Sequence, residues 1–181
     1  MKSLVCSIAL SFLTVSAFAQ NETEPTPITP VNSWLKVGAN GGIPIGNFGD
    51  HYNAFVGIEL NGQFMSTRHL GLGVASGYTH YFSKKSQPTD TMSYGDFGAI
   101  PVGFLLRYYP KAKGIYMGVD AGFTFVPEDL KRGGFYVRPQ VGYHNRNWNF
   151  YAFYNHVFNN KNYNDLQGIG VAVVYNLRFK R

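Results

Sequence analysis

The sequence predicts an all-β protein: an eight-stranded antiparallel up-and-down transmembrane β-barrel. Three observations lead to this fold class. Eight segments between Trp34 and Phe179 alternate apolar residues with small or polar ones, which is the period-two pattern of a strand with two different faces. The links between these segments alternate between long and tight. Aromatic residues make up 17% of the chain and glycines number 21, which suits aromatic belts around a crowded barrel interior.

The N-terminal segment is expected to be a cleaved export signal. Lys2 is followed by an apolar stretch over residues 4–15 and by Ala17-Phe18-Ala19, an A-x-A cleavage site. Cys6 is the only cysteine and lies inside this signal, so the mature chain has neither a disulfide nor a thiol nucleophile. The expected divisions are a signal peptide at 1–19, an extended proline-rich periplasmic leader at 20–33 and the barrel domain at 34–181.

In each expected strand one face is apolar and is expected to meet lipid, while the other face lines the lumen. The apolar positions of the first four strands are Leu35, Val37 and Ala39 in 34–43; Val56, Ile58, Leu60 and Phe64 in 54–65; Leu70, Leu72, Val74 and Tyr78 in 69–82; and Ile100, Val102, Phe104, Leu106 and Tyr108 in 97–109. The first of these strands has the weakest alternation.

The last four strands repeat the pattern, and the final one is the clearest because its alternation is the longest. Their apolar positions are Ile115, Met117, Val119, Ala121, Phe123 and Phe125 in 115–126; Phe135, Val137, Val141 and Tyr143 in 135–144; Trp148, Phe150, Ala152, Tyr154 and Phe158 in 148–158; and Ile169, Val171, Val173, Tyr175, Leu177 and Phe179 in 168–179.

The links alternate as they do in outer-membrane barrels, which have short periplasmic turns and longer outer loops. Pro101 and Pro139 lie inside expected strands, and proline cannot donate to the ladder, so we expect bulges or local distortion there. An interior of eight strands holds only side chains or one small ligand. The tight links are 66–68, 110–114 and 145–147, and the longer ones are 44–53, 83–96, 127–134 and 159–167.

Three features together resemble the small outer-membrane β-barrel family that includes the OmpA membrane domain, OmpX and PorT-like proteins. They are the export signal, Ile100-Pro101-Val102-Gly103 followed by Arg107-Tyr108-Tyr109, and the closing Val174-Tyr175-Asn176-Leu177-Arg178-Phe179. The resemblance covers Trp34 to Phe179. It implies a Gram-negative outer membrane, barrel-insertion machinery as a partner during biogenesis, and a place for the chain in a secretion or assembly complex.

The expected lumen face carries charge. Lys36, Arg107, Arg138 and Arg178 share it with two acids, Glu59 and Asp120. Because unpaired buried charges are costly, we expect a structural ion network, with Asp120 between Arg107 and Arg138 and with Glu59 approaching Lys36. We place Lys36 and Arg178 near the solvated periplasmic rim. The alternative is an anion path through a narrow pore.

Catalytic and metal sites are not predicted. The segment Tyr154 to Asn160 is similar to the H-x-S-N element of the lipid A deacylase PagL, with His156 and Asn159 matching, but Phe158 occupies the serine position and leaves no hydroxyl to activate. We therefore expect an interfacial histidine there. The five histidines are scattered over both ends and both faces, without the spacing of metal ligands, so no metal or cofactor is expected.

The outer loops are the candidate contact surface, because Tyr, Asn and Gly suit adaptable recognition. Asp90-Thr91-Met92 also resembles a short bacterial O-glycosylation motif. The net charge is +6, but the basic residues form no stripe, so nucleic acid is excluded and anionic lipid headgroups fit better. The candidate loop contacts are Phe48, His51, Tyr52, Lys84, Lys85, Tyr94 and Tyr163.

These observations predict a non-catalytic outer-membrane barrel with a structural role in the envelope or a loop-mediated role toward a protein or glycan. A narrow channel for small or amphipathic solutes is the second reading. An enzyme acting on outer-membrane lipid is the third.

Overall fold

The computed structural model describes most of the expected barrel domain. The expected signal peptide and leader lie outside the described residues, as do Lys85, Thr91, Tyr94 and Tyr163 and the side chains of Trp34 and Arg178. The described residues are 34–67, 69–84, 95–127, 133–145, 147–159 and 165–178.

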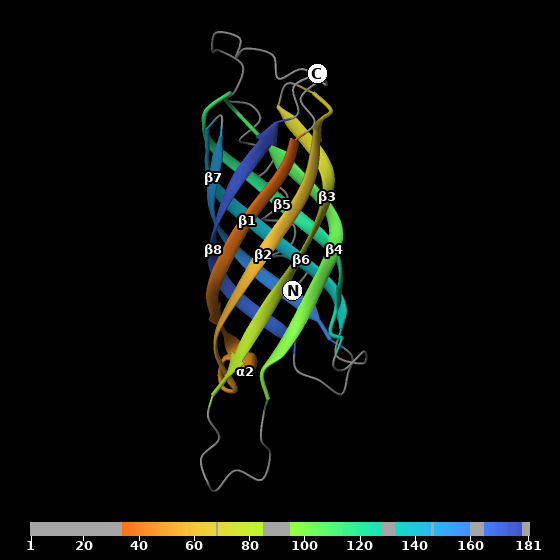
Figure 1. Ribbon diagram of the computed structural model, residues 1–181, viewed down its shortest axis with the longest axis vertical. Coiled ribbons are helices and arrows are strands. Elements are labelled where there is room, and N and C mark those ends of the chain that lie inside the picture. The colour runs from red at the N-terminus through yellow and green to blue at the C-terminus, as the bar shows by residue number, and fades with distance from the viewer. Residues whose placement is uncertain are drawn as a thin grey trace, which may run out of the picture.

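Within these residues the predicted fold is confirmed: eight antiparallel strands form a closed barrel, each pairs with its sequence neighbours, and β1 pairs with β8 (Figure 1). The elements are β1 (Trp34–Pro44), α2 (Gly46–Gly49), β2 (Tyr52–Met65), β3 (Leu70–Ser83), β4 (Phe97–Tyr108), β5 (Gly114–Phe125), β6 (Gly134–His144), β7 (Trp148–Phe158) and β8 (Leu166–Arg178).

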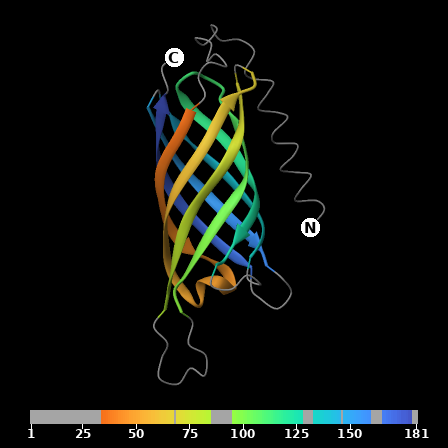
Figure 2. The same cartoon turned by 45° about the vertical axis from the view of Figure 1, so that its right-hand side comes forward.

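The two ends of the barrel differ. Figure 2 shows α2 at one end of the tilted strands, which we call the loop end. The opposite end, which we call the turn end, carries the tight links near residues 66–69, 109–113 and 145–147. None of the described helices is long and apolar enough to cross a membrane.

Period-two alternation places the two faces as predicted. Ile58 on β2 is 65% exposed while its neighbour Glu59 is 4% exposed, and Phe104 on β4 is 76% exposed beside a buried Leu105. All eight strands carry large apolar side chains on the outer wall. The barrel therefore has an apolar outside and a polar and aromatic inside, because successive strand residues point to opposite faces.

The two prolines interrupt the ladder without shifting its register. Pairing of β3 with β4 passes from Ser76–Val102 to Thr79–Ala99 around Pro101. The pairing of β6 with β7 is broken in the same way around Pro139. Of the two expected alternatives, local distortion is the one present at both sites, because the strands keep one register on either side of each proline. The register shift between β2 and β3 lies instead at Tyr52 and Ala54.

Close approach of the strands requires glycine at Gly122 on β5. A Cβ atom there would lie 2.2 Å from the carbonyl oxygen of Val102 and 2.3 Å from the Cα of Gly103. Because both contacts are backbone atoms, they cannot move without bending β4. We expect Gly122→Ala to lower the free energy of unfolding by about 1–3 kcal/mol.

Gly95 provides the control for this substitution, because a Cβ atom there would meet nothing within 4 Å. Urea unfolding of both variants in lipid vesicles measures the difference. Equal midpoints for Gly122→Ala and Gly95→Ala would contradict the steric argument.

Candidate functional site

The centre of the lumen holds a layer of paired charges. Arg107 on β4 and Asp120 on β5 form an ion pair with 2.5 Å between Nη1 and Oδ1. Gln140 on β6 donates from Nε2 to the other oxygen of Asp120 at 3.1 Å, and Arg107 also donates to the carbonyl of Val119 at 3.3 Å. Asp120 is thus held from both neighbouring strands, with its ion pair to Arg107 and its amide partner on β6.

A second ion pair crosses the lumen. Arg138 on β6 donates from Nη2 to Oε1 of Glu59 on β2. Tyr151 donates its hydroxyl proton to Oε2 of Glu59, and Asn40 donates to Oε1 at 2.8 Å. The Arg138 guanidinium also lies over the Phe153 ring, 3.8 Å from its centroid. Glu59 is therefore bound by groups from β1, β6 and β7.

These pairings correct two expectations. Glu59 pairs with Arg138 on the opposite wall, although we expected it to approach Lys36, and Asp120 pairs with Arg107 while Arg138 turns to Glu59. The reason is the barrel's size: β2 and β6 are four strands apart in a ring of eight, and a lumen this narrow lets long side chains meet across it.

Lys36 is buried, with 5% exposure, and does not lie at a solvated rim as expected. Its ammonium group donates to the hydroxyl of Tyr109 at 3.1 Å, and Tyr109 donates in turn to Gln63 at 3.0 Å. Tyr116 and His144 pack their rings against Tyr109. Tyrosines thus close the lumen on the turn side of the charged layer.

An aromatic cluster closes the lumen at the loop end. Phe48 of α2 inserts between Tyr52 and Tyr81, with ring centroids 4.6 and 5.3 Å away, and Tyr81 stacks on Phe97 at 4.9 Å. Phe48 and Tyr52 are 3% and 2% exposed. The expectation that these two rings are open to a partner is therefore wrong, because α2 folds them inward.

The remaining described loop contacts stay at the surface. Lys84 is exposed, and its ammonium group donates to the carbonyl of Gly49 at 2.7 Å. Its backbone N–H donates to the carbonyl of His51 at 2.8 Å, and His51 is half-buried. These bonds join the end of β3 to the segment after α2. The expected contacts Lys85, Tyr94 and Tyr163 lie outside the described residues.

Two small cavities lie among the described side chains of the lumen. One cavity, of about 20 Å³, is bounded by Asn40, Arg138 and the loop-end aromatics, and another, of about 10 Å³, lies beside Lys36 and Arg107. A water molecule needs about 10–15 Å³, so each holds one water at most. In the described part of the lumen these cavities do not form a solute path.

On the outer wall, His156 lies in a chain of polar contacts that the sequence did not predict. His156 Nδ1 lies 2.9 Å from the Tyr154 hydroxyl, and His156 Nε2 lies 2.9 Å from Asp165 Oδ2. Phe158, which occupies the serine position of the PagL-like element, stacks on the imidazole at 4.2 Å. Asn159 meets the same carboxylate through its backbone, because its N–H donates to Asp165 Oδ1 at 3.0 Å.

The same arrangement recurs on the opposite wall. Tyr78 lies 3.5 Å from His80 Nδ1, Asp96 lies 3.8 Å from His80 Nε2, and Phe82 meets the imidazole edge-on at 4.9 Å. The shared signal is Tyr-x-His-x-Phe at the end of a strand, at 78–82 and 154–158, with an aspartate just before the next strand. The Tyr-x-His-x-Phe repeat can be read from the sequence. The contacts of the two aspartates with the histidines cannot, because links of different length separate each aspartate from its histidine.

Asp96 also joins the residue before β4 to Ser83 at the end of β3. The Ser83 N–H and hydroxyl each donate to Asp96 Oδ1 at 2.7 Å, and these bonds lower the pKa of Asp96 below its ordinary value. A depressed pKa means that this contribution to stability is complete above the ordinary carboxyl pKa and is lost only as pH falls through the lower, folded-state value.

We therefore expect the Ser83 amide resonance to stay in its bound position as pH falls through the ordinary aspartate range, and to shift only in stronger acid. A pH titration by NMR in detergent measures this. Ser83→Ala removes one donor and is expected to move the transition to higher pH; a transition at the ordinary value in the parent protein would contradict the assignment.

No described group of three or more His, Cys, Asp or Glu side chains could hold a metal ion. No protein-family model matches the chain, and no curated protein matches its sequence.

Proposed function

We propose that this protein is a non-catalytic integral β-barrel of a bacterial outer membrane, exported through a cleaved signal peptide, with a structural or loop-mediated role in the cell envelope. The observation that carries the proposal is the inversion of polarity: an apolar wall surrounds a charged and aromatic lumen. Strands of membrane barrels have this arrangement, with apolar side chains facing the hydrocarbon outside and polar ones facing the lumen.

The extent of the apolar wall supports lipid over water. Soluble monomers seldom expose apolar patches larger than a few hundred Å², whereas here every strand contributes exposed aliphatic or aromatic side chains. Aromatic residues lie outward near both ends, with Trp148 and Tyr175 toward the turn end and Tyr78 and Phe158 toward the loop end. Aromatic belts of this kind mark the two interfaces of a bilayer.

The packed lumen favours a structural role over a channel. Paired charges and two aromatic layers fill it, and the described cavities hold single waters. We expect the purified barrel to show no stable conductance in a planar bilayer. Arg138→Ala is also expected to show no stable conductance. Anion-selective conductance of the parent barrel that disappears in Arg138→Ala would support the channel instead.

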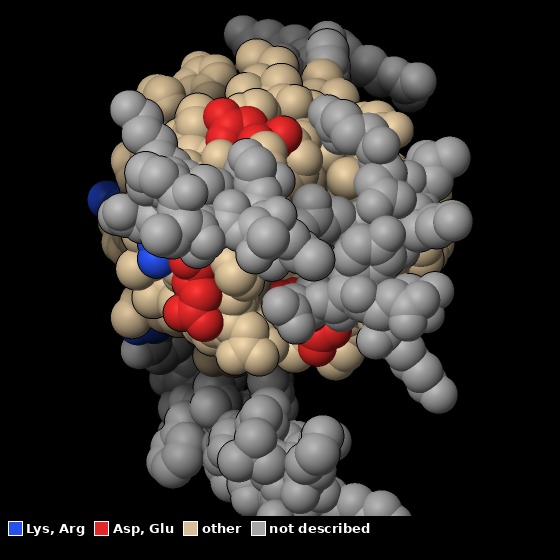
Figure 3. Space-filling model, turned by 90° about the horizontal axis from the view of Figure 1, so that it is seen from below, with Lys and Arg blue, Asp and Glu red and all other residues tan. Residues whose placement is uncertain are grey.

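The loop end is the surface offered to partners. Figure 3 views it directly and shows acidic side chains around it. Among the described residues at this end, Asp50 and Asp96 are exposed and Asp165 is partly so, beside the cation Lys84. The resemblance to PorT-like barrels supports a partner in a secretion or assembly complex, met through these loops.

Crosslinking of intact cells that express a tagged copy tests this role. A discrete partner that is lost when the links β3–β4 and β7–β8 are shortened would support loop-mediated interaction. Recovery of the barrel with only abundant envelope components would support a self-contained structural role. Recovery of the tagged chain outside the membrane fraction would contradict the proposal as a whole.

A further inference from the structure

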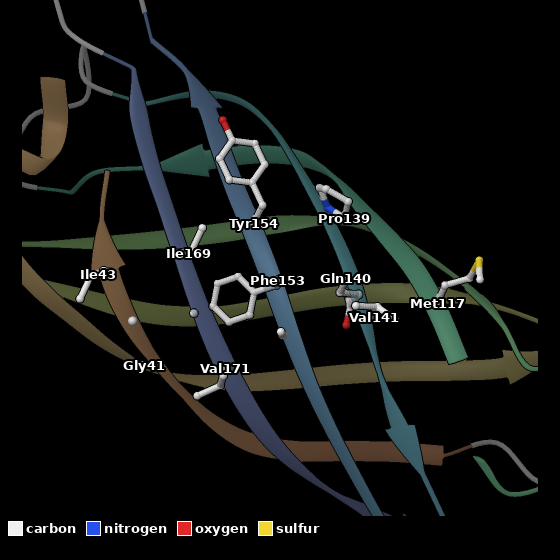
Figure 4. A pocket seen from close by; sticks show the side chains of 13 residues that line it. Gly41, Ile43, Met117, Pro139, Gln140, Val141, Phe153, Tyr154, Ile169 and Val171 are labelled. Carbon is white, nitrogen blue, oxygen red and sulfur yellow. The ribbon is translucent and has the colours of Figure 1, made fainter. Parts of the chain in front are cut away.

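A groove of about 820 Å³ lies in the outer wall, across β5, β6, β7, β8 and β1 (Figure 4). We infer that this groove seats one acyl chain of a membrane lipid, with the polar end of that lipid at the Tyr154–His156 pair. The inference rests on the proposed membrane location and adds a specific lipid site to it.

Two rows of outward residues line the groove. Strand pairing places Gly41, Val171 and Ala152 in one row. The second row runs from Ile43 through Ile169 to Tyr154 by the same pairings, and Figure 4 shows these three side chains on successive strands, with Pro139 beyond them. The second row lies two residues closer to the loop end than the first, so the groove extends along the barrel as well as around it.

The groove is hollow because its floor is built from small residues. Gly41 has no side chain and Ala152 has only a methyl group, whereas Ile43, Val171 and Val141 beside them in the lining carry larger side chains. On the turn side the next outward row is bulky on β6, β7 and β8, where Tyr143, Phe150 and Val173 are all more than 40% exposed. A hollow in a membrane-facing wall is filled by whatever hydrocarbon surrounds it, and this one has the size of a small-ligand site.

Two polar residues line the groove: Gln140 near its middle, which donates to Asp120 in the lumen, and Tyr154 on its loop side. Tyr154 lines the groove with its ring, while its hydroxyl lies 2.9 Å from His156, which is held by Asp165. An apolar channel with a hydrogen-bonding end complements an amphiphile, whose tail is apolar and whose head is polar. A second barrel would present an apolar wall along the whole height and would leave this polar end without a counterpart.

The opposite wall supplies an internal control. His80 has the same Tyr, Phe and Asp neighbours as His156, but none of the strand β3 residues lines the groove. Val74 on β3 is 57% exposed and Val171 in the groove is 64% exposed. Phenylalanine at either position adds the same bulk to the outer wall, but only at Val171 does it fill the groove.

The test uses the full-length protein reconstituted in vesicles of phosphatidylethanolamine and phosphatidylglycerol, extracted into mild detergent and weighed by native mass spectrometry. The parent barrel and Val74→Phe are expected to retain one phospholipid each. Val171→Phe and Ala152→Phe are expected to lose it. Circular dichroism checks that each variant keeps its strands. The two groove variants fill the groove from different strands, so one of them suffices if the other fails to fold.

The outcomes separate the site from the membrane location. Co-flotation with vesicles followed by extraction of a bare parent barrel would overturn the lipid site and leave the proposed function standing. Failure to float with vesicles would overturn both. A dimer that dissociates in Val171→Phe, or phospholipid retained equally by both groove variants, would overturn the lipid site in favour of a second copy or of adventitious retention.

Discussion

Arg138→Met is expected to lower the free energy of unfolding by about 3–5 kcal/mol, because it leaves Glu59 charged and without its ion pair inside the barrel. Glu59 is 4% exposed, and its remaining donors, Asn40 and Tyr151, are neutral. Water cannot replace the guanidinium, since the neighbouring cavity of about 20 Å³ has room for one molecule at most.

The double variant Glu59→Gln with Arg138→Met separates the buried charge from lost packing. Glutamine keeps the shape of the side chain and an oxygen that can accept from Asn40, and its amide N–H can donate to the hydroxyl oxygen of Tyr151. Most of the lost stability is therefore expected to return. Replacing both partners of a buried ion pair is often close to neutral. Urea unfolding in vesicles measures Arg138→Met, Glu59→Gln and the double variant. Lys113→Met, at an exposed position, is the control for loss of a surface cation.

Two outcomes would contradict this account. If Arg138→Met unfolded within about 1 kcal/mol of the parent protein, the cross-lumen pair would be worth no more than an exposed one. If the double variant were destabilised by the sum of the single variants, the two residues would act independently.

The strands could be predicted closely because their signal is local. A period of two depends only on neighbouring residues, and it placed β7 at its observed bounds, Trp148–Phe158, and β4 within one residue of them. The prolines were also readable as ladder breaks. Whether a break shifts the register depends on the partner strand, which is why bulges and local distortion were both left open. The ladders at Pro101 and Pro139 are interrupted without a register shift.

Contacts across the lumen and within loops could not be predicted from local sequence patterns. Strand adjacency suggested Lys36 as the partner of Glu59. The observed partner is Arg138, which the closed barrel brings across the lumen from the opposite wall. The helix α2 spans four residues, too few for a helical period, and its Phe48 looked like any loop aromatic. Asp165 was missed for a related reason, since its contact with His156 depends on how the end of β7 and the start of β8 come together.

The outer wall, which we propose faces lipid, gives the second large effect. Phe104→Arg is expected to destabilise the barrel in a bilayer by about 2–4 kcal/mol, the cost of a cation on a lipid-facing strand near the midplane. Phe104 lies near the middle of β4 and is 76% exposed, so its replacement removes little packing. In water the same substitution at so exposed a position would be close to neutral.

Depth provides the control for Phe104→Arg. Tyr108 points to the same side of β4 at the turn end, where an arginine in a bilayer costs only about 0–1 kcal/mol. Reversible unfolding from vesicles is therefore expected to rank Phe104→Arg well below Tyr108→Arg in stability. Equal effects at the two depths would contradict a bilayer around the wall, because they would mean that both positions face the same medium. The apolar surface would then have to be covered by protein, since soluble monomers do not expose apolar patches of this extent to water.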